Sequence, residues 1–485
     1  MRWLAWVTGL VVAGGAAAAL GLAALSLRWP LVHDAPLMHY VAWLVTVGAV
    51  PYRDVFDMNF PGVYLVHLLV VRVLGVGDLA WRLFDLAWLA ATVALLAGFA
   101  RPWGRSAAAG AGVLFVLYHL AGGAWQAGQR DFLLCPLLVA GALGVARWLE
   151  SRRRSSLAWG GLALGASITI KPHALALVVA LALTVALAAW RRGADVGAPA
   201  LFVASVLAAP LAVSVWLVAA GALPAWRAIV LDYLIPLYAR LGRDGAWNVY
   251  RPQVWIPIVA GALLSMAGAL AGRRFGARHA VATLGVLYGV AHFVGQRKGW
   301  EYHLYPLAVF ATLLCAAGLP PRRSPRRVRS TAPVLVAVAL AIVLLAGKAL
   351  AVSPAGWERD KADATRRLAA ELAPMLAPGE RVQVLDTTEG GIHALLRLGV
   401  REPTRFIYDF HFFHDTDRPV IQALRAELIH ELDAHPPALI VVFERGWPSG
   451  GYERIDGFPE LAARLARYDL VQAGPGYRIH AQRHR

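Results

Sequence analysis

Eleven long, mostly apolar runs dominate this 485-residue sequence. A helix needs about 20 consecutive apolar residues to cross a bilayer core, and unpaired backbone groups there are too costly for looser structures. With 58% hydrophobic and 16% charged residues, the chain is not disordered and does not resemble a simple soluble enzyme. We therefore predict a polytopic α-helical membrane protein with about eleven transmembrane helices. The predicted spans are residues 3–27, 79–100, 106–125, 132–149, 157–170, 173–190, 198–222, 253–271, 280–295, 302–319 and 332–351.

The net charge of +17 suggests a nucleic-acid binder only until its distribution is considered. Residues 1–352 carry 30 Lys and Arg against 11 Asp and Glu, whereas residues 353–485 carry 17 against 19. Sixteen arginines lie in one alternating set of short segments, and such basic loops mark the cytoplasmic side. The charge therefore indicates orientation, and we expect no nucleic-acid partner. These segments are Arg2 and the loops 101–105, 152–154, 191–192, 273–278 and 322–329.

Eight of the eleven acids in the apolar part lie in the opposite set of loops. This alternation predicts a cytoplasmic N-terminus, and an odd number of spans then places the chain after Val352 outside. The first apolar run is too long for the core of a cleaved signal peptide, so we expect it to remain as an anchor.

Two further patterns set the domain organisation. Residues 35–49 and 62–76, in the first outer loop, are amphipathic or polar-flanked and predict helices lying in the membrane interface. Residues 353–485 have the composition of a soluble domain, and residues 1–352 form the transmembrane domain. The soluble part predicts an α/β domain with strands at 381–386, 404–409, 438–444 and 468–474, and helices at 359–376, 420–432 and 459–466.

Charged side chains beside apolar helices are costly unless they pair or form a site, so each one is a functional candidate. The first outer loop contains Asp34, Asp54 and Asp57 together with Arg53. Carboxylates are suited to act as a general base on a hydroxyl, or to hold a divalent cation through their oxygens. Two structural roles stay open as alternatives: Asp34 caps the helix that follows, and Asp54 pairs with Arg53.

Arg130 and Asp131 stand where the third span meets the fourth on the outer side. A helix cap explains Asp131 as well as a place in a site does. Lys171 lies at an outer turn between two spans that otherwise lack charge. It either reaches to the interface or holds a phosphate as a point charge.

The segment 295–306 gathers cations and aromatic rings in one outer turn. An interfacial aromatic belt explains Tyr302, but not Arg297 and Lys298 on the side where basic residues are disfavoured. We predict that this turn, with His303, binds phosphate. Acids for proton transfer and cations for a lipid phosphate, next to apolar helices, suit an enzyme whose donor is a sugar on a long-chain lipid phosphate.

The order of first span, Asp34, amphipathic helix and the segment "GAVPYRDVFDMNFPG" (48–62) resembles the membrane-embedded GT-C glycosyltransferases. It is similar to the branch that contains the protein O-mannosyltransferases and the aminoarabinose lipid A transferases. The resemblance covers about residues 1–350 and implies that Asp34 is the base and Asp131 a second acid. Lys171 and the segment 295–306 also look like those of bacterial members. The sequence departs from the family's Lys-Pro-Pro, having Asn59-Phe60-Pro61, and Asp57 matches only loosely.

We therefore predict an inverting glycosyltransferase of the bacterial inner membrane, with its tail domain in the periplasm. It would transfer a sugar from a polyprenyl-phosphate donor to a lipid, glycan or protein acceptor of the cell envelope. Asp34 would take the acceptor proton, and Asp131 and Asp57 would orient the acceptor or a cation. The cations predicted to hold the donor phosphate are Lys171, Arg297, Lys298 and His303, and the predicted substrate loop comprises Arg53, Asp54, Arg130 and Tyr302.

The sequence demands no cofactor; if a divalent cation such as Mg or Mn takes part, Asp34 and Asp131 are its expected ligands. A transporter or lipid flippase is the main alternative, although repeated halves and broken helices at mid-membrane are not evident. An O-antigen ligase or polymerase would carry its main outer loop late in the chain. A membrane scaffold that presents the tail domain is a further class.

Overall fold

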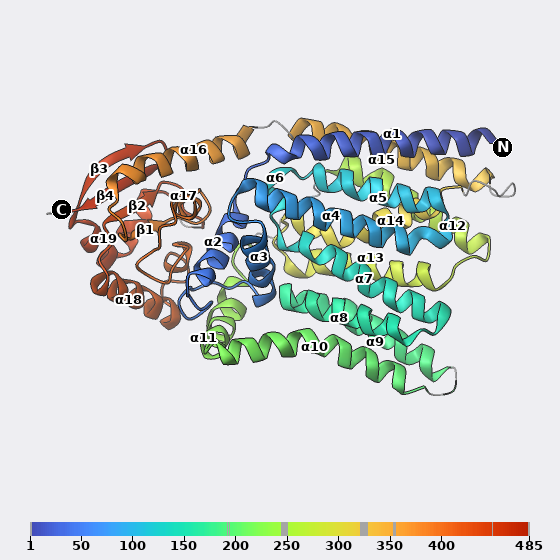
Figure 1. Cartoon of the computed structure of the whole chain (residues 1–485), viewed down its shortest axis with the longest axis horizontal. Coiled ribbons are helices and arrows are strands. Elements are labelled where there is room, and N and C mark those ends of the chain that lie inside the picture. The colour runs from blue at the N-terminus through green and yellow to red at the C-terminus, as the bar shows by residue number, and fades with distance from the viewer. Residues whose placement is uncertain are drawn as a thin grey trace.

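The computed structural model describes residues 2–191, 193, 195–243, 251–320, 328–352, 356–448 and 450–483. Within them, eleven helices run side by side as a long bundle, one for each predicted span (Figure 1). A helix pairs most of its backbone groups within its own segment, as a lipid environment requires. The bundle consists of α1 (Arg2–Leu25), α4 (Asp78–Ala100), α5 (Arg105–Leu120), α7 (Arg130–Ser151), α8 (Arg154–Ile170), α9 (Leu175–Trp190), α10 (Gly197–Ala219), α12 (Pro252–Ala271), α13 (Ala277–Gln296), α14 (Tyr305–Ala317) and α15 (Val328–Val352).

Seven helices of the described chain are long and apolar enough to cross a membrane, against the eleven predicted. The other four, α5, α8, α13 and α14, are 13 to 20 residues long and shorter or more polar. Helix α14 is almost entirely enclosed by its neighbours, so its sides face protein and its length need not match the bilayer. The prediction of a polytopic helical membrane protein with a C-terminal domain is confirmed.

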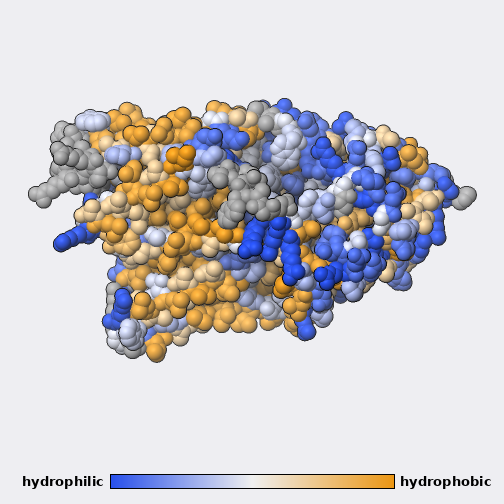
Figure 2. Space-filling view, turned by 180° about the vertical axis from the view of Figure 1, so that it is seen from behind, coloured by the Kyte–Doolittle hydropathy of each residue, from blue (hydrophilic) through white to orange (hydrophobic). Residues whose placement is uncertain are grey.

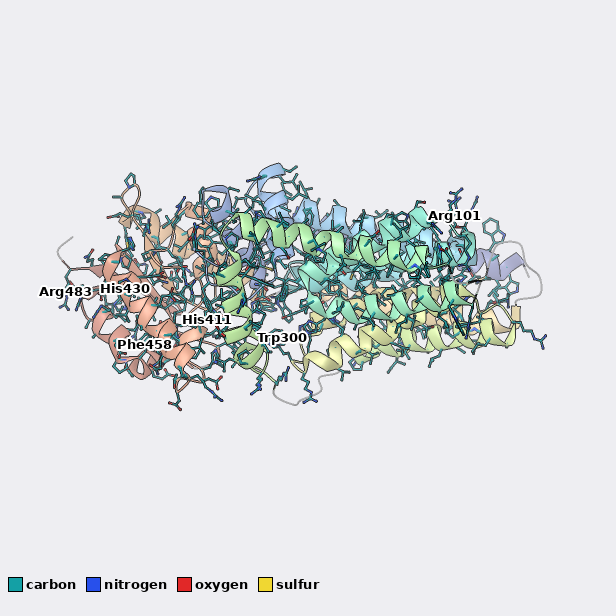
Figure 3. The ribbon with its side chains drawn as sticks, turned by 90° about the horizontal axis from the view of Figure 1, so that it is seen from below. Arg101, Trp300, His411, His430, Phe458 and Arg483 are labelled. Carbon is teal, nitrogen blue, oxygen red and sulfur yellow. The ribbon has the colours of Figure 1, made fainter. Side chains whose placement is uncertain are left out.

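On the face shown in Figure 2, the surface of the bundle is mostly apolar, and that of the C-terminal domain is mostly hydrophilic. Trp6 and Leu211 on the bundle are 73% and 60% exposed, which suits contact with lipid chains. Arg101, from one of the basic loops, lies at the end of the bundle away from the C-terminal domain, whereas Trp300 lies beside that domain (Figure 3). The basic loop 322–329 and Arg192 fall largely or wholly outside the described residues, as do residues 353–355 at the predicted domain boundary.

Two helices of the first outer loop lie between the bundle and the C-terminal domain (Figure 1). These are α2 (Asp34–Thr46) and α3 (Pro61–Val73), close to the two amphipathic segments of the sequence. Helix α2 is enclosed on most sides: Tyr40 and Val41 are fully buried, and the Tyr40 hydroxyl donates to the carbonyl of Val400 at 3.1 Å. This helix is therefore held between two layers of protein. The other short segments of the membrane part are η1 (Ser26–Arg28), η2 (Arg101–Trp103), α6 (Gly123–Ala127), η3 (Pro172–Ala174), α11 (Leu223–Ala228), the π-helix η4 (Ile229–Tyr238) and η5 (Glu301–Leu304).

The C-terminal domain is a four-stranded sheet with helices packed around it. The strand order is β1-β2-β4-β3; β1 pairs with β2 in parallel, and the β3–β4 hairpin adds two antiparallel strands. The strands are β1 (Val382–Leu385), β2 (Leu439–Phe443), β3 (Tyr468–Gly474) and β4 (Tyr477–Gln482). The helical segments are α16 (Gly356–Leu372), η7 (Ala373–Met375), α17 (Gly391–Leu398), η8 (Phe410–Phe412), α18 (Pro419–Ala434), η9 (Tyr452–Gly457) and α19 (Pro459–Leu465).

The predicted strand at 404–409 is wrong, and the sequence pattern did not reveal β4 and α17. The strand that pairs with β2 on the side away from β1 is β4. A short turn at residues 475–476 connects β3 to β4 and lets β4 run antiparallel between β2 and β3. Residues 404–409 instead lie against the first outer loop, where Phe56 N donates to Arg405 O at 2.7 Å and Phe406 forms a single bridge with Phe56. The apolar residues of this segment are buried by that contact, which explains the strand-like pattern.

Close backbone contacts hold parts of the bundle together. A Cβ placed on Gly144 of α7 would lie 2.5 Å from Ser156 O and 2.8 Å from the Cα of Gly160, both on α8. Glycine is thus required for α7 and α8 to approach this closely, as at many helix contacts in membranes.

We expect Gly144→Ala to destabilise the protein by about 1–3 kcal/mol through this clash, although Ala otherwise favours a helix. Gly21→Ala in α1 is the matched control, because its added Cβ would meet nothing within 4 Å. The midpoint of thermal unfolding in detergent measures both. Equal midpoints for the two variants would contradict the close packing.

Candidate functional site

A cavity of about 330 Å³ lies where one end of the bundle meets the C-terminal domain. The first outer loop, the start of α7, η4 and the turn at Trp300 contribute to one wall, and the C-terminal domain contributes the other. Of the predicted site residues, Asp34, Arg130 and Tyr302 line it. The remaining lining residues are His33, Met58, Asn59, Trp125, Tyr238, Trp300, Thr387, Thr388, Glu389, Tyr408, Phe410 and Trp447.

Asp34 begins α2, and its carboxylate accepts a hydrogen bond from Gln129 Nε2 at 2.9 Å. The side chain is 23% exposed, so it remains accessible from the cavity. Burial acts to raise the pKa of Asp34, but His33, Arg130 and the Gln129 hydrogen bond outweigh it and lower the pKa below the usual value. Burial lowers the pKa of His33, whereas the Arg130 guanidinium, which lines the same cavity, carries its positive charge at any ordinary pH.

Arg130 is positioned by the first outer loop. Its guanidinium donates to the Asn59 side-chain oxygen, and its buried Nε has no hydrogen-bond partner among the described residues. Asn59 in turn donates to Asp57 at 3.0 Å, and Tyr64 donates to the same carboxylate at 2.5 Å. A half-buried cation with an unused, buried donor at a cavity is suited to bind an anion.

Asp57 is 1% exposed and does not line the cavity. Burial raises its pKa, and the hydrogen bonds from Tyr64 and Asn59 act in the opposite direction. In this structure its carboxylate organises the loop that holds Arg130.

Asp131, next to Arg130, faces a different set of partners below the cavity. Its carboxylate accepts from Lys171 Nζ at 2.7 and 2.9 Å and lies 2.6 Å from His292 Nε2. Asp131 and His292 are fully buried, and the ring of His303 lies 6.1 Å from that of His292. Lys171 and His303 therefore belong to a buried cluster around Asp131 and do not line the cavity.

Lys298 lies at the edge of the cavity between two lining aromatic rings. Its Nζ is 3.7 Å from the ring centre of Tyr238 and 4.8 Å from that of Trp300, and it donates to Tyr238 O at 3.3 Å. Burial lowers its pKa to about 7, and Arg130, Lys171 and Arg243 add to the effect. The ammonium is held by cation–π contacts that also fix η4.

Three other predicted site residues are not part of the cavity lining. Arg297 is exposed in a left-handed conformation at the end of α13. Arg53 and Asp54 form an exposed ion pair at 2.7 Å, one of the two structural roles that the sequence left open.

The two expected metal ligands do not fit a shared divalent-cation site. Lys171 and His292 already occupy the Asp131 carboxylate, and Asp34 is bonded to Gln129. Across the part of the chain that is described, no group of three or more His, Cys, Asp or Glu could hold a metal ion.

The C-terminal half of the lining was not predicted from the sequence. Thr387, Thr388 and Glu389 follow β1 directly, and Trp447 follows β2. The carboxyl ends of parallel strands meet at one edge of a sheet, so the β1–β2 order was the signal that would have located them. Trp125 and Tyr238 were hidden among aromatic residues that an interfacial belt also explains.

No protein-family model matches this sequence, and no curated protein matches it significantly. Two crystal structures of ArnT from Cupriavidus metallidurans match its three-dimensional structure. The apo form is 15% identical with a TM-score of 0.61, and the form bound to undecaprenyl phosphate is 16% identical with a TM-score of 0.63. Each alignment covers 98% of this chain and 98% of the other.

The chain has the fold of ArnT. The likeness extends through the C-terminal domain, because nearly the whole of both chains is aligned. The predicted resemblance to the GT-C branch that contains the aminoarabinose lipid A transferases is thus confirmed for the fold. At this low identity the ArnT fold does not by itself assign an activity.

We expect Asp131→Ala to lower stability strongly, by about 3–5 kcal/mol, because it leaves Lys171 charged without its partner. The double variant Asp131→Ala/Lys171→Met should recover part of this loss. Thermal unfolding in detergent gives the measurement.

Asp54→Asn is the control, because the Arg53–Asp54 pair is exposed and its loss should leave the unfolding midpoint almost unchanged. Equal effects of Asp131→Ala and Asp54→Asn would contradict a stabilising role of the buried cluster.

Proposed function

We propose that the chain is an inverting glycosyltransferase that uses a polyprenyl-phosphate-linked sugar and acts on a cell-envelope acceptor. The observation that carries the proposal is that the Asp34 carboxylate and the Arg130 guanidinium share one cavity at the end of an apolar bundle. The ArnT fold supports it, since one ArnT structure of this fold is bound to undecaprenyl phosphate.

In this proposal Asp34 accepts the proton of the acceptor hydroxyl while the hydroxyl oxygen attacks the anomeric carbon of the sugar. The bond from that carbon to the phosphate oxygen breaks, and its electron pair leaves with the polyprenyl phosphate. Attack from the face opposite the leaving group inverts the anomeric configuration. Asp34 is suited to this role because it stays ionised at neutral pH and faces the cavity.

Cations near the cavity would stabilise the phosphate as its charge develops. Arg130 has an unused buried donor, and Lys298 lies between two lining rings. Lys171 would act through Asp131, which it contacts. The polyprenyl chain would remain in lipid beside the apolar bundle, whose long helices carry many exposed apolar side chains.

We place the reaction on the periplasmic side of the bacterial inner membrane. Support comes from the charge distribution: Arg101, from one of the basic loops typical of the cytoplasm, lies at the end of the bundle away from the C-terminal domain (Figure 3). In this orientation the C-terminal domain faces the periplasm. The sugar acceptor would then be a lipid, glycan or protein of the cell envelope.

We expect Asp34→Asn to reduce transfer of radiolabelled sugar from a polyprenyl phosphate by about 10²–10⁴-fold, because the amide cannot accept the proton. The assay uses membranes from expressing cells, with protein levels matched by immunoblot. Asp232→Asn, an exposed carboxylate on η4, is the control and should keep full activity. Unchanged transfer by Asp34→Asn would remove this residue as the base.

The pKa of Lys298, about 7, predicts a pH dependence of phosphate binding. The ammonium is present below that pKa and is lost as the pH rises through it, so undecaprenyl phosphate should bind more weakly at alkaline pH. Lys298→Arg keeps its charge and should move the decline to higher pH. Affinity measured by microscale thermophoresis across the neutral and alkaline range tests this; identical pH profiles for the two proteins would contradict it.

A further inference from the structure

The C-terminal domain presents one edge of its sheet to the cavity. The parallel strands β1 and β2 end there, and the segments that follow them supply Thr387, Thr388, Glu389 and Trp447 to the lining. In open α/β sheets, ligands bind outside the carboxyl ends of parallel strands. This edge is therefore placed where such a domain would hold a ligand.

The loop after β1 is closed by hydrogen bonds to one side chain. The Asp386 carboxylate accepts backbone hydrogen bonds from Glu389 at 2.7 Å, Gly390 at 3.0 Å and Gly391 at 2.8 Å. Gly390 has a φ of +124°, and a Cβ on Gly391 would lie 2.2 Å from Val384 Cγ1. Both glycines are thus needed for the loop to close on Asp386, which positions the backbone of Glu389 at the cavity.

Two polar side chains of this loop remain available to a ligand. Glu389 Oε1 accepts from Lys361 Nζ at 3.3 Å, while Oε2 has no hydrogen-bond partner among the described residues. Thr387 donates to Asp409 at 3.0 Å and so is already used. Thr388 lines the cavity, and its hydroxyl has no such partner in the described chain.

Aromatic rings from both walls surround these polar groups. The rings of Trp300 and Trp447 are 6.5 Å apart, so the two walls meet at this point. Phe410 lies 5.6 Å from Trp447 and 5.9 Å from Tyr238, which extends the aromatic lining around the cavity. A pocket with apolar rings and a few fixed polar groups is typical of a site for a small ligand.

A sugar ring has apolar C–H faces and polar hydroxyls, which match the aromatic rings and the polar side chains of this wall. Its C–H faces pack on aromatic rings, and its hydroxyls donate to carboxylates and exchange hydrogen bonds with threonine. The volume of about 330 Å³ is at the small end for ligand pockets, which suits one sugar unit. Arg130 on the opposite wall is suited to the phosphate bonded to that sugar.

We infer that the C-terminal domain binds the transferred sugar, with Glu389 and Thr388 hydrogen-bonding its hydroxyls and Trp447 packing on its ring. This inference rests on the proposed function, and it makes the C-terminal domain the part of the chain that selects the donor sugar. The transmembrane part then supplies Asp34 and the phosphate site.

The test compares bare undecaprenyl phosphate with undecaprenyl phosphate carrying glucose, mannose, N-acetylglucosamine or aminoarabinose. Affinities are measured by microscale thermophoresis on the full chain in detergent. At least one sugar should improve binding about tenfold over the bare lipid. Glu389→Gln and Thr388→Val should each remove most of that advantage and leave the affinity for bare undecaprenyl phosphate unchanged.

Trp447→Leu should act in the same way, as a variant that changes packing and not hydrogen bonding. Glu460→Gln, an exposed carboxylate of α19 on the same domain, is the matched control and should keep the full advantage. The inference is overturned if no sugar improves binding, or if the site variants keep the advantage or weaken both ligands alike. A different result would contradict the proposed function itself: the wild-type chain would not bind bare undecaprenyl phosphate.

Discussion

The structure depends on the requirement that no backbone polar group be left unpaired in lipid. This requirement makes every span a helix and leaves irregular chain only at the two ends of the bundle. The catalytic candidates Asp34 and Arg130 therefore lie at helix starts, at the end of the bundle that meets the C-terminal domain. Because side chains there are partly shielded from water, the charges around Asp34 are strong enough to lower its pKa despite burial.

The cavity exists because the first outer loop is packed between two layers. Helix α2 is enclosed by the bundle and the C-terminal domain, and Tyr40 bonds to Val400 and Glu402 across that contact. In a second contact between the two parts of the chain, Trp125 N donates to the Glu358 carboxylate at 2.9 Å, which links α6 to α16. These contacts hold Asp34 and Glu389 on opposite walls of one cavity, so the site is shared between the two parts of the chain.

Neighbouring charged residues have different roles because their surroundings differ. Arg130 reaches the cavity, whereas the next residue, Asp131, turns into the protein to meet Lys171 and His292. A buried charge destabilises the fold unless it is paired. An ionised group at a cavity that has an unused hydrogen-bond donor or acceptor can bind a ligand. The buried cluster around Asp131 therefore stabilises the protein next to the site, and Arg130 faces the cavity.

The sequence by itself determined the eleven helices, the helices α2 and α3, the soluble α/β tail and three of its four strands. These follow from local signals: apolar length, the period of the pattern and the charge of short loops. It also selected Asp34, Arg130 and Tyr302, which share the cavity. Only the tertiary structure separated them from Asp131, Asp57 and the Arg53–Asp54 pair, and only it brought Glu389 and Trp447 to the same place. The physical reason is that spacing along the chain fixes which element carries a side chain, whereas its partners come from other elements, between 40 and 360 residues away in the sequence.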